Sequence, residues 1–300
     1  MIAISLLLAQ GCVPGPADTG VGADTVGRDS DSSTDSASPA QHFFVSVASG
    51  GAFSCAIDHD GELLCWGSDL AGQAEPPAGA YDTVTLGQDF GCAREVDSGW
   101  RCWGNTSRLG GAPAGWERYP SIDVGWEGVC ALDDHGAVAC WGEDSEGETQ
   151  APGGTYSSVR MGAVRACALD AVGIATCWGW AYDGGTVAPV EPMTALDVGL
   201  AHACGITALD STPLCWGQDL FGETELDAIP LQAVSCGGTT TCAILENGHV
   251  DCWGEGIGRL NWYANYVSLA VGAGHACGVD DQGVIYCWGD DTFGQASPPG

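Results

Sequence analysis

Fourteen of the 16 cysteines in this chain recur at a spacing that could support disulfide or metal chemistry. The tripeptide Cys-Trp-Gly occurs seven times, and another cysteine precedes each copy by ten or eleven residues. Structural zinc sites usually leave about two to four residues between paired ligands, and two thiolates alone do not complete a site. The spacing therefore favours one disulfide per copy of the motif, which requires an oxidising compartment.

A β-hairpin would bring the two cysteines of each pair together. In five copies a glycine stands six residues after the first cysteine, as in His59-Asp60-Gly61, where a three-residue hairpin loop needs a left-handed residue. In that register Cys55 lies opposite Cys65, and cross-strand Cα atoms about 4.5 to 5.5 Å apart suit a disulfide. The copies that begin at Cys92 and Cys204 have altered loops, so their pairing is inferred by analogy. The seven expected pairs are Cys55–Cys65, Cys92–Cys102, Cys130–Cys140, Cys167–Cys177, Cys204–Cys215, Cys242–Cys252 and Cys277–Cys287.

The same motif defines an internal repeat. First cysteines follow one another at steps of 35 to 38 residues, so seven units fill the chain from about residue 43 to residue 300. Within a hairpin, Cys55 and Ile57 point to one face while Ala56 and Trp66 point to the other, so both faces are apolar. Small sheets covered on both faces and repeated radially form a β-propeller, whereas a seven-coil solenoid would need caps that neither end shows. We predict an all-β, seven-bladed β-propeller with one intra-hairpin disulfide per blade and repeats at about residues 43–80, 81–118, 119–155, 156–192, 193–230, 231–265 and 266–300.

The units resemble repeats of the regulator of chromosome condensation family. The resemblance rests on segments such as Val84-Thr-Leu-Gly87, Cys102-Trp-Gly104 and Ile285-Tyr-Cys-Trp-Gly-Asp-Asp-Thr-Phe-Gly-Gln295, and it covers residues 43–300. It implies a seven-bladed propeller. The short units and their cysteine pairs are similar in style to secreted, cysteine-rich bacterial members. The guanine-exchange and nucleosome-binding roles of nuclear members are not carried over, because the surface residues that perform them have no match here.

The N-terminus resembles a bacterial lipoprotein signal. A short apolar run from Ile2 to Ala9 is followed by Gln10-Gly11-Cys12, which predicts a signal and anchor at residues 1–12 with Cys12 acylated. An ordinary cleaved signal peptide or an incidental apolar N-terminus is the alternative. Residues 13–42 contain five aspartates and no aromatic residue, which predicts a disordered linker. We expect an extracytoplasmic protein, either a lipoprotein of the cell envelope or outer membrane or a secreted protein.

The charge excludes several classes of function. The chain has 39 Asp and Glu but only 8 Lys and Arg, all of them Arg, and a formal net charge of −31. Without lysine there can be no P-loop lysine, kinase lysine or Schiff base. Nucleic-acid binding depends largely on Arg and Lys, so we expect no nucleic-acid partner and no membrane contact except through the lipid anchor.

Other residues show no enzyme signature. His202 and His275 occupy the same repeat position and are expected to be structural, although a metal held by both in a central channel would favour the alternative, an exported propeller lyase or glycan-active enzyme. The acidic loops 133–136 and 143–148 do not fit the calcium-binding EF-hand pattern. Cys236 stands where five other units carry Leu86, Val124, Met161, Val198 and Val271, so it is expected to be a buried free thiol. We predict no catalytic residue, no metal and no cofactor.

Recognition by surface loops remains as the favoured function. The loop before each first cysteine and the loop after each Trp-Gly should emerge on one rim of the propeller. Aromatic and arginine side chains in variable loops suit protein recognition, although packing between blades could account for about half of them. We expect a monomer that binds a protein or surface ligand. The candidate rim residues are Phe53, Phe90, Trp126, Arg165, Trp180, Tyr182 and Phe221.

Overall fold

A computed structural model describes residues 42–181, 184–255 and 264–299. The chain divides into two units, Met1–Ala40 and Gln41–Gly300, and every described residue belongs to the second. Cys12, the signal-like segment and the linker up to residue 41 lie outside the described residues. Within the described part, no helix is long and apolar enough to cross a membrane.

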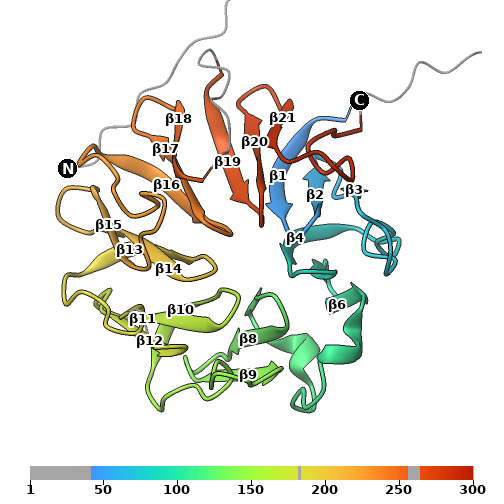
Figure 1. Cartoon of the computed structure of the whole chain (residues 1–300). Coiled ribbons are helices and arrows are strands. Elements are labelled where there is room, and N and C mark those ends of the chain that lie inside the picture. Colours follow the sequence, from blue (N-terminus) through green and yellow to red (C-terminus); the bar gives the residue numbers. More distant parts are fainter. Residues whose placement is uncertain (1–41, 182–183, 256–263, 300) are drawn as a thin grey trace, which may run out of the picture. The chain divides into compact units, whose positions relative to one another are not determined.

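The unit Gln41–Gly300 consists of seven three-stranded antiparallel sheets, each made of consecutive strands and arranged in a ring (Figure 1). The inner strands are β1 (Phe44–Ser49), β4 (Tyr81–Leu86), β7 (Ser121–Val124), β10 (Tyr156–Met161), β13 (Met193–Val198), β16 (Leu231–Cys236) and β19 (Tyr266–Val271). The middle strands are β2 (Phe53–Asp58), β5 (Phe90–Glu95), β8 (Gly128–Leu132), β11 (Arg165–Asp170), β14 (His202–Thr207), β17 (Thr240–Leu245) and β20 (His275–Asp280). The outer strands are β3 (Leu63–Gly67), β6 (Gly99–Gly104), β9 (Val138–Gly142), β12 (Ala175–Gly179), β15 (Pro213–Gly217), β18 (Val250–Gly254) and β21 (Ile285–Gly289).

Each sheet is one blade, numbered 1 to 7 in chain order. Strands β19 and β20 of blade 7 pack against β1 of blade 1, which closes the ring. Two short 3₁₀ helices, η1 (Thr106–Arg108) and η2 (Trp116–Arg118), lie in the connection between blades 2 and 3. The predicted seven-bladed all-β propeller is confirmed.

The predicted hairpin disulfides are also confirmed. All seven pairs link facing residues of a middle and an outer strand, including the two pairs inferred by analogy, and their Cα atoms are 4.0–4.1 Å apart. The hairpin glycines are left-handed as expected, for example Gly61 at φ 83°. In the two altered loops the positive φ is adopted by Asp97 and the shifted glycine Gly99 after Cys92, and by Ser211 after Cys204. Cys236 is buried and is the free cysteine of the described residues.

A ring of glycines joins neighbouring blades at one end of the inner strands. A Cβ atom on any of these glycines would lie 2.1–2.6 Å from the carbonyl oxygen of the corresponding glycine in the next blade, so no other residue fits. The residue after each glycine donates its N–H to a carbonyl oxygen of the next blade at 2.9–3.4 Å, and Ala273 completes the circle by donating to Gly50. We call this set the glycine ring: Gly50, Gly87, Gly125, Gly162, Gly199, Gly237 and Gly272.

The two loops expected on one rim do lie together. In all seven blades the residue after Trp-Gly donates its N–H to a carbonyl oxygen of the loop that precedes the middle strand, as Ser68 does to Ala52 at 2.8 Å. Both loops therefore emerge on the side of the glycine ring, which we call the glycine face. The turns between middle and outer strands form the opposite side, the hairpin face.

Candidate functional site

Three of the candidate rim residues are buried between blades, and their assignment to the rim is wrong. Phe53, Phe90 and Arg165 each have 0% of their surface exposed. They open the middle strands, at the same repeat position as His202 and His275, two residues before the first cysteine. A side chain at this position points into the next blade. Phe53 accordingly packs with Leu86 and Trp103 of blade 2.

Arg165 occupies the same interface between blades 4 and 5. Its guanidinium carbon lies 5.5 Å from the centre of the Trp180 ring. A Cβ atom on Gly185 would overlap the guanidinium, so the following loop packs directly over it. Arg165 is therefore a packing residue of the blade rather than an exposed contact residue.

The two repeated histidines link neighbouring blades. His202 Nε2 lies 2.8 Å from Thr241 Oγ1 of blade 6, and His275 Nε2 lies 2.8 Å from Ser54 Oγ of blade 1. The Thr241 hydroxyl donates to the Glu223 carbonyl oxygen, so the imidazole must donate to the hydroxyl. Burial lowers the pKa of both histidines to about 4, which keeps the rings neutral. Neither histidine lines the central channel, so they form no metal site there.

The central channel is a cavity of about 350 Å³ lined by the seven inner strands. Its most distinctive side chains stand two residues before each glycine of the ring. In blades 3, 4 and 5 this position is charged, whereas in the other four blades it is small. In chain order the position holds Ala48, Thr85, Asp123, Arg160, Asp197, Ser235 and Ala270.

The channel carboxylates cap the inner edges of neighbouring blades. Asp123 Oδ2 accepts the Met161 N–H at 2.7 Å, and Asp197 Oδ2 accepts the Cys236 N–H at 2.7 Å. The hydroxyl of Thr85 accepts the Val124 N–H in the same way. An inner strand has no further strand beside it, so these oxygens satisfy N–H groups that would otherwise lack a partner.

Burial dominates the electrostatics of this charged arc. Burial raises the pKa of Asp123, and it raises the pKa of Asp197 to about 6, while the positive charge of Arg160 opposes both shifts. An arc of two carboxylates and one guanidinium can bind a small polar molecule. Among the described lining residues, the Thr85 hydroxyl donates to Asp123 Oδ1 at 3.2 Å and accepts the Val124 N–H, so this hydroxyl–carboxylate pair links blades 2 and 3. Reasoning from the sequence missed this arc, and the signal was three charged residues at one repeat position in consecutive units.

The remaining rim candidates differ in exposure. Trp126 and Trp180 are half-buried, Trp126 at the channel wall and Trp180 over Arg165. Phe221 is 48% exposed, and Tyr182 lies outside the described residues. These three described aromatics stay candidates for recognition.

Further large apolar side chains are exposed in loops of the glycine face, as Phe221 is. Leu70 is 89% exposed, Leu220 68% and Phe293 52%. Each lies five or six residues after the cysteine of Cys-Trp-Gly, so the tips belong to equivalent loops of blades 1, 5 and 7. We call Leu70, Leu220, Phe221 and Phe293 the apolar tips. Three of them were missed from the sequence because aromatic residues and arginine were considered there rather than equivalent positions.

An aspartate accompanies every apolar tip. Asp69, Asp219 and Asp291 are exposed and stand four residues after the second cysteine of their blades. Each accepts the N–H of the residue five positions on, at 2.8–3.0 Å, which fixes the loop. Each tip thus presents an apolar side chain next to a negative charge.

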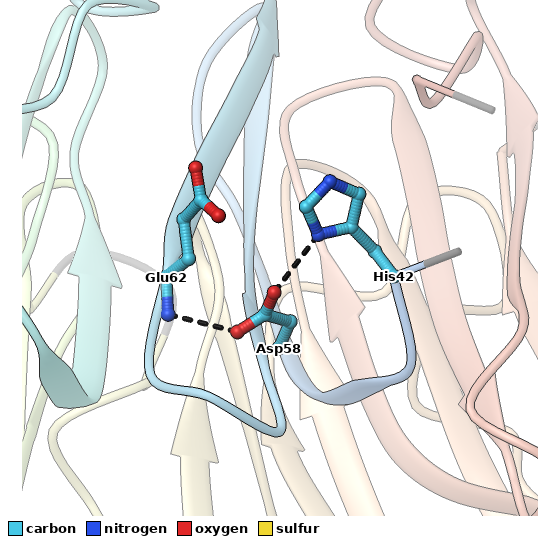
Figure 2. Close-up of side chains that lie close together, drawn as sticks. All are labelled: His42, Asp58 and Glu62. Atoms are coloured by element: carbon cyan, nitrogen blue, oxygen red, sulfur yellow. Dashed lines mark hydrogen bonds and ion pairs between the residues drawn. The ribbon is translucent and has the colours of Figure 1, made fainter. Parts of the chain in front are cut away.

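The acidic loops considered for calcium use their carboxylates internally. Asp133 Oδ1 accepts the N–H groups of His135 and Ala137, and Glu148 accepts the N–H of Glu146. Within the described part of the chain, the group of metal-ligating side chains that lies close enough to share an ion is His42, Asp58 and Glu62 (Figure 2).

Comparison with known proteins supports the repeat assignment. Residues 44–73, 232–256 and 266–295 match the family model of the regulator of chromosome condensation (RCC1) repeat. The search of curated proteins finds no match to the sequence. The chain is therefore a seven-bladed β-propeller in which three segments match the regulator of chromosome condensation repeat, in line with the resemblance seen in the sequence.

Solved structures show the same fold. The ectodomain of the receptor kinase CR4 from Physcomitrella patens is 25% identical, with a TM-score of 0.70 over 82% of this chain and 72% of that chain. The CRINKLY WD40 ectodomain of ACR4 from Arabidopsis thaliana is 24% identical, with a TM-score of 0.69 over 83% and 96%. Yeast RCC1 (Prp20) is 18% identical, with a TM-score of 0.53 over 85% and 72%. Together with the seven disulfides, the ectodomain neighbours indicate an extracellular location.

Proposed function

We propose that this protein is an extracellular binding module whose glycine face recognises a protein that presents basic and apolar side chains. The observation that carries the proposal is the set of apolar tips. Four large apolar side chains are exposed at equivalent positions on one face of a rigid, disulfide-linked scaffold. Such side chains gain free energy when a partner removes them from water.

The negative charge of the chain favours a basic partner. The net charge is −31, and Asp69, Asp219 and Asp291 lie next to the tips. A basic surface would therefore be drawn to this face by long-range attraction, and its apolar side chains would then pack on the tips. The half-buried Trp126 and Trp180 extend the same surface toward the channel and toward blade 4.

The proposed setting is the outside of the cell, with the propeller held at a membrane through an acylated Cys12. The signal-like sequence that ends at Cys12 and the acidic linker that follows support this proposal. A Cys12→Ser variant should lose incorporation of labelled palmitate and should leave the detergent phase for the aqueous phase. Unchanged labelling of the variant would refute the anchor and leave the recognition surface unaffected.

A matched pair of variants in blade 5 tests the recognition surface. The double variant Leu220→Ser/Phe221→Ser removes two apolar tips from the glycine face. Leu209→Ser removes a leucine that is 95% exposed in the hairpin turn of the same blade. Wild type and both variants would be used, side by side, to capture proteins from solubilised cell-surface fractions, followed by affinity measurement on each specifically captured protein.

We expect the double variant to weaken binding at least about tenfold, since each tip is of a size that contributes roughly 1–2 kcal/mol when buried. Leu209→Ser should bind as wild type does. Added salt should slow association if the partner is basic. Equal binding by the double variant, or a loss with Leu209→Ser alone, would show that the glycine face is not the recognition surface.

A further inference from the structure

Three side chains of types that commonly ligate metals lie close together where the chain enters blade 1. His42 stands just before β1, Asp58 ends β2, and Glu62 lies in the turn before β3, so all three come from one blade (Figure 2). One ligand atom from each can be chosen so that all lie within 4.8 Å of one another. His42 Nδ1 is 2.8 Å from Asp58 Oδ2. The imidazole also stacks on Phe44, with ring centres 5.8 Å apart, which holds the ring in place.

The hairpin turn itself uses the other oxygen of Asp58. Asp58 Oδ1 accepts the N–H groups of Asp60 and Glu62 at 3.0 and 2.8 Å. The corresponding aspartates of blades 3, 4 and 7 make the same two bonds to their own turns, through Oδ1 in each case. These aspartates are Asp133, Asp170 and Asp280. Turn formation therefore accounts for one oxygen of Asp58 and leaves Oδ2 available.

The same comparison shows that neither His42 nor Glu62 is needed to form the turn. The blades that share the aspartate carry Ala137, Ile174 and Val284 where blade 1 has Glu62. The residue eight positions before the glycine of the ring is His42 in blade 1 only. In the other blades this position holds Gly79, Glu117, Gly154, Glu191, Ile229 and Ala264. Blade 1 thus places a nitrogen ligand and a second carboxylate around the Asp58 oxygen that its turn does not use.

We propose that His42, Asp58 and Glu62 form a binding site for a divalent transition metal, with Zn²⁺ as the best fit. One imidazole nitrogen and two carboxylate oxygens are a donor set that suits Zn²⁺, whereas Ca²⁺ takes six to eight oxygen ligands. The ion would replace the hydrogen bond between Nδ1 and Oδ2, and water would complete its coordination because Glu62 faces solvent. The net negative charge of the chain raises the local concentration of cations.

Such an ion would have a structural consequence for the propeller. It would tie the segment that leads into β1 to the hairpin turn of the same blade. Blade 1 is also the blade against which blade 7 closes the ring. Zn²⁺ should therefore raise the thermal stability of the protein, because a ligand that binds only the folded state stabilises it.

Calorimetric titration of the chelator-treated full-length protein with Zn²⁺ tests this site. The test variants are His42→Ala and Glu62→Gln, neither of which alters the bonds that Asp58 makes to the turn. The matched control is His59→Ala, which removes an exposed histidine from the same hairpin, one whose ring lies near Asp60. Near-ultraviolet circular dichroism of each variant confirms that the propeller is folded.

We expect one ion per chain, at least tenfold weaker binding in both test variants, and wild-type binding in the control. The Zn²⁺-dependent rise in melting temperature should disappear in His42→Ala. Absence of Zn²⁺ binding to wild type would overturn the assignment, as would binding that survives in both test variants or is lost in His59→Ala. These outcomes are independent of partner recognition, because the apolar tips lie on the glycine face.

Discussion

Replacement of Gly272 by alanine tests the structural role of the glycine ring. Gly272 belongs to blade 7 and faces blade 1, where the circle of blades closes. A Cβ atom at this position would lie 2.4 Å from the Gly50 carbonyl oxygen and 2.5 Å from His275 Cε1. Ordinary contacts begin about 1 Å farther out, so the two blades must separate. We therefore expect Gly272→Ala to destabilise the propeller at its closing interface.

Three contributions set the size of the effect. Overpacking of a rigid site costs roughly 1–3 kcal/mol. The same movement strains the hydrogen bond from the Ala273 N–H to the Gly50 carbonyl oxygen, which contributes about 1 kcal/mol. Reduced freedom of the unfolded chain offsets about 0.4–1 kcal/mol. The net destabilisation is about 2 kcal/mol, equivalent to a fall of roughly 4–8 °C in melting temperature for a domain of this size.

Gly274→Ala is the matched control, two residues away in the same loop. A Cβ atom there would meet its nearest neighbour, Asp290 Cβ, at 3.6 Å, an ordinary contact. Both variants would be melted without reductant and followed by circular dichroism. The control should melt within about 2 °C of wild type. Equal melting temperatures for Gly272→Ala and Gly274→Ala would refute the account of the glycine ring.

Three further outcomes are expected. Each disulfide closes a loop of about ten residues and contributes roughly 2–3 kcal/mol, so reductant should lower the melting temperature by tens of degrees in a calorimetric scan, and a shift of a few degrees would contradict this. The pKa of His202 falls from 6.5 to about 4 on folding, so between these pH values the unfolded chain binds more protons than the folded chain. About 3 kcal/mol of folding stability that is present above pH 6.5 should therefore be lost as the pH falls to 4. Burial raises the pKa of Asp197 from 3.8 to about 6, so this group stabilises the folded state as the pH falls and opposes the effect of His202. In urea titrations at pH 7 and pH 4.5, the loss of folding stability in acid should be smaller in His202→Gln and larger in Asp197→Asn than in wild type. Ser54→Ala should cost about 1–3 kcal/mol in urea titrations, because it removes the hydroxyl that donates to the Gln295 carbonyl oxygen and therefore accepts from buried His275. An unchanged midpoint would show that this bond contributes nothing.

The framework could be predicted from the sequence because the signals for it are local. A disulfide in each unit follows from a hairpin register that spans ten residues, and the number of blades follows from the number of units. The sequence did not show why a glycine recurs before each first cysteine, because the steric reason is a carbonyl oxygen of the next blade.

Contacts between blades explain the errors at the candidate site. Phe53, Phe90 and Arg165 were expected on the rim, yet they share a position with His202 and His275, which was already regarded as structural. A pair such as Ser54 and His275 is separated by 221 residues and meets only because the ring closes. The charged arc of Asp123, Arg160 and Asp197 was hidden by the general acidity of the chain, since only the strand register shows that these side chains face the channel.

Hydrogen–deuterium exchange of the propeller with and without a specifically captured partner tests the recognition surface most directly. The loops that carry the apolar tips, residues 68–75, 218–224 and 290–296, should exchange more slowly in the complex. The hairpin turns at residues 59–62, 133–137 and 208–212 should exchange at the same rate in both states. Protection confined to the hairpin turns, with unchanged exchange at the apolar tips, would contradict recognition through the glycine face.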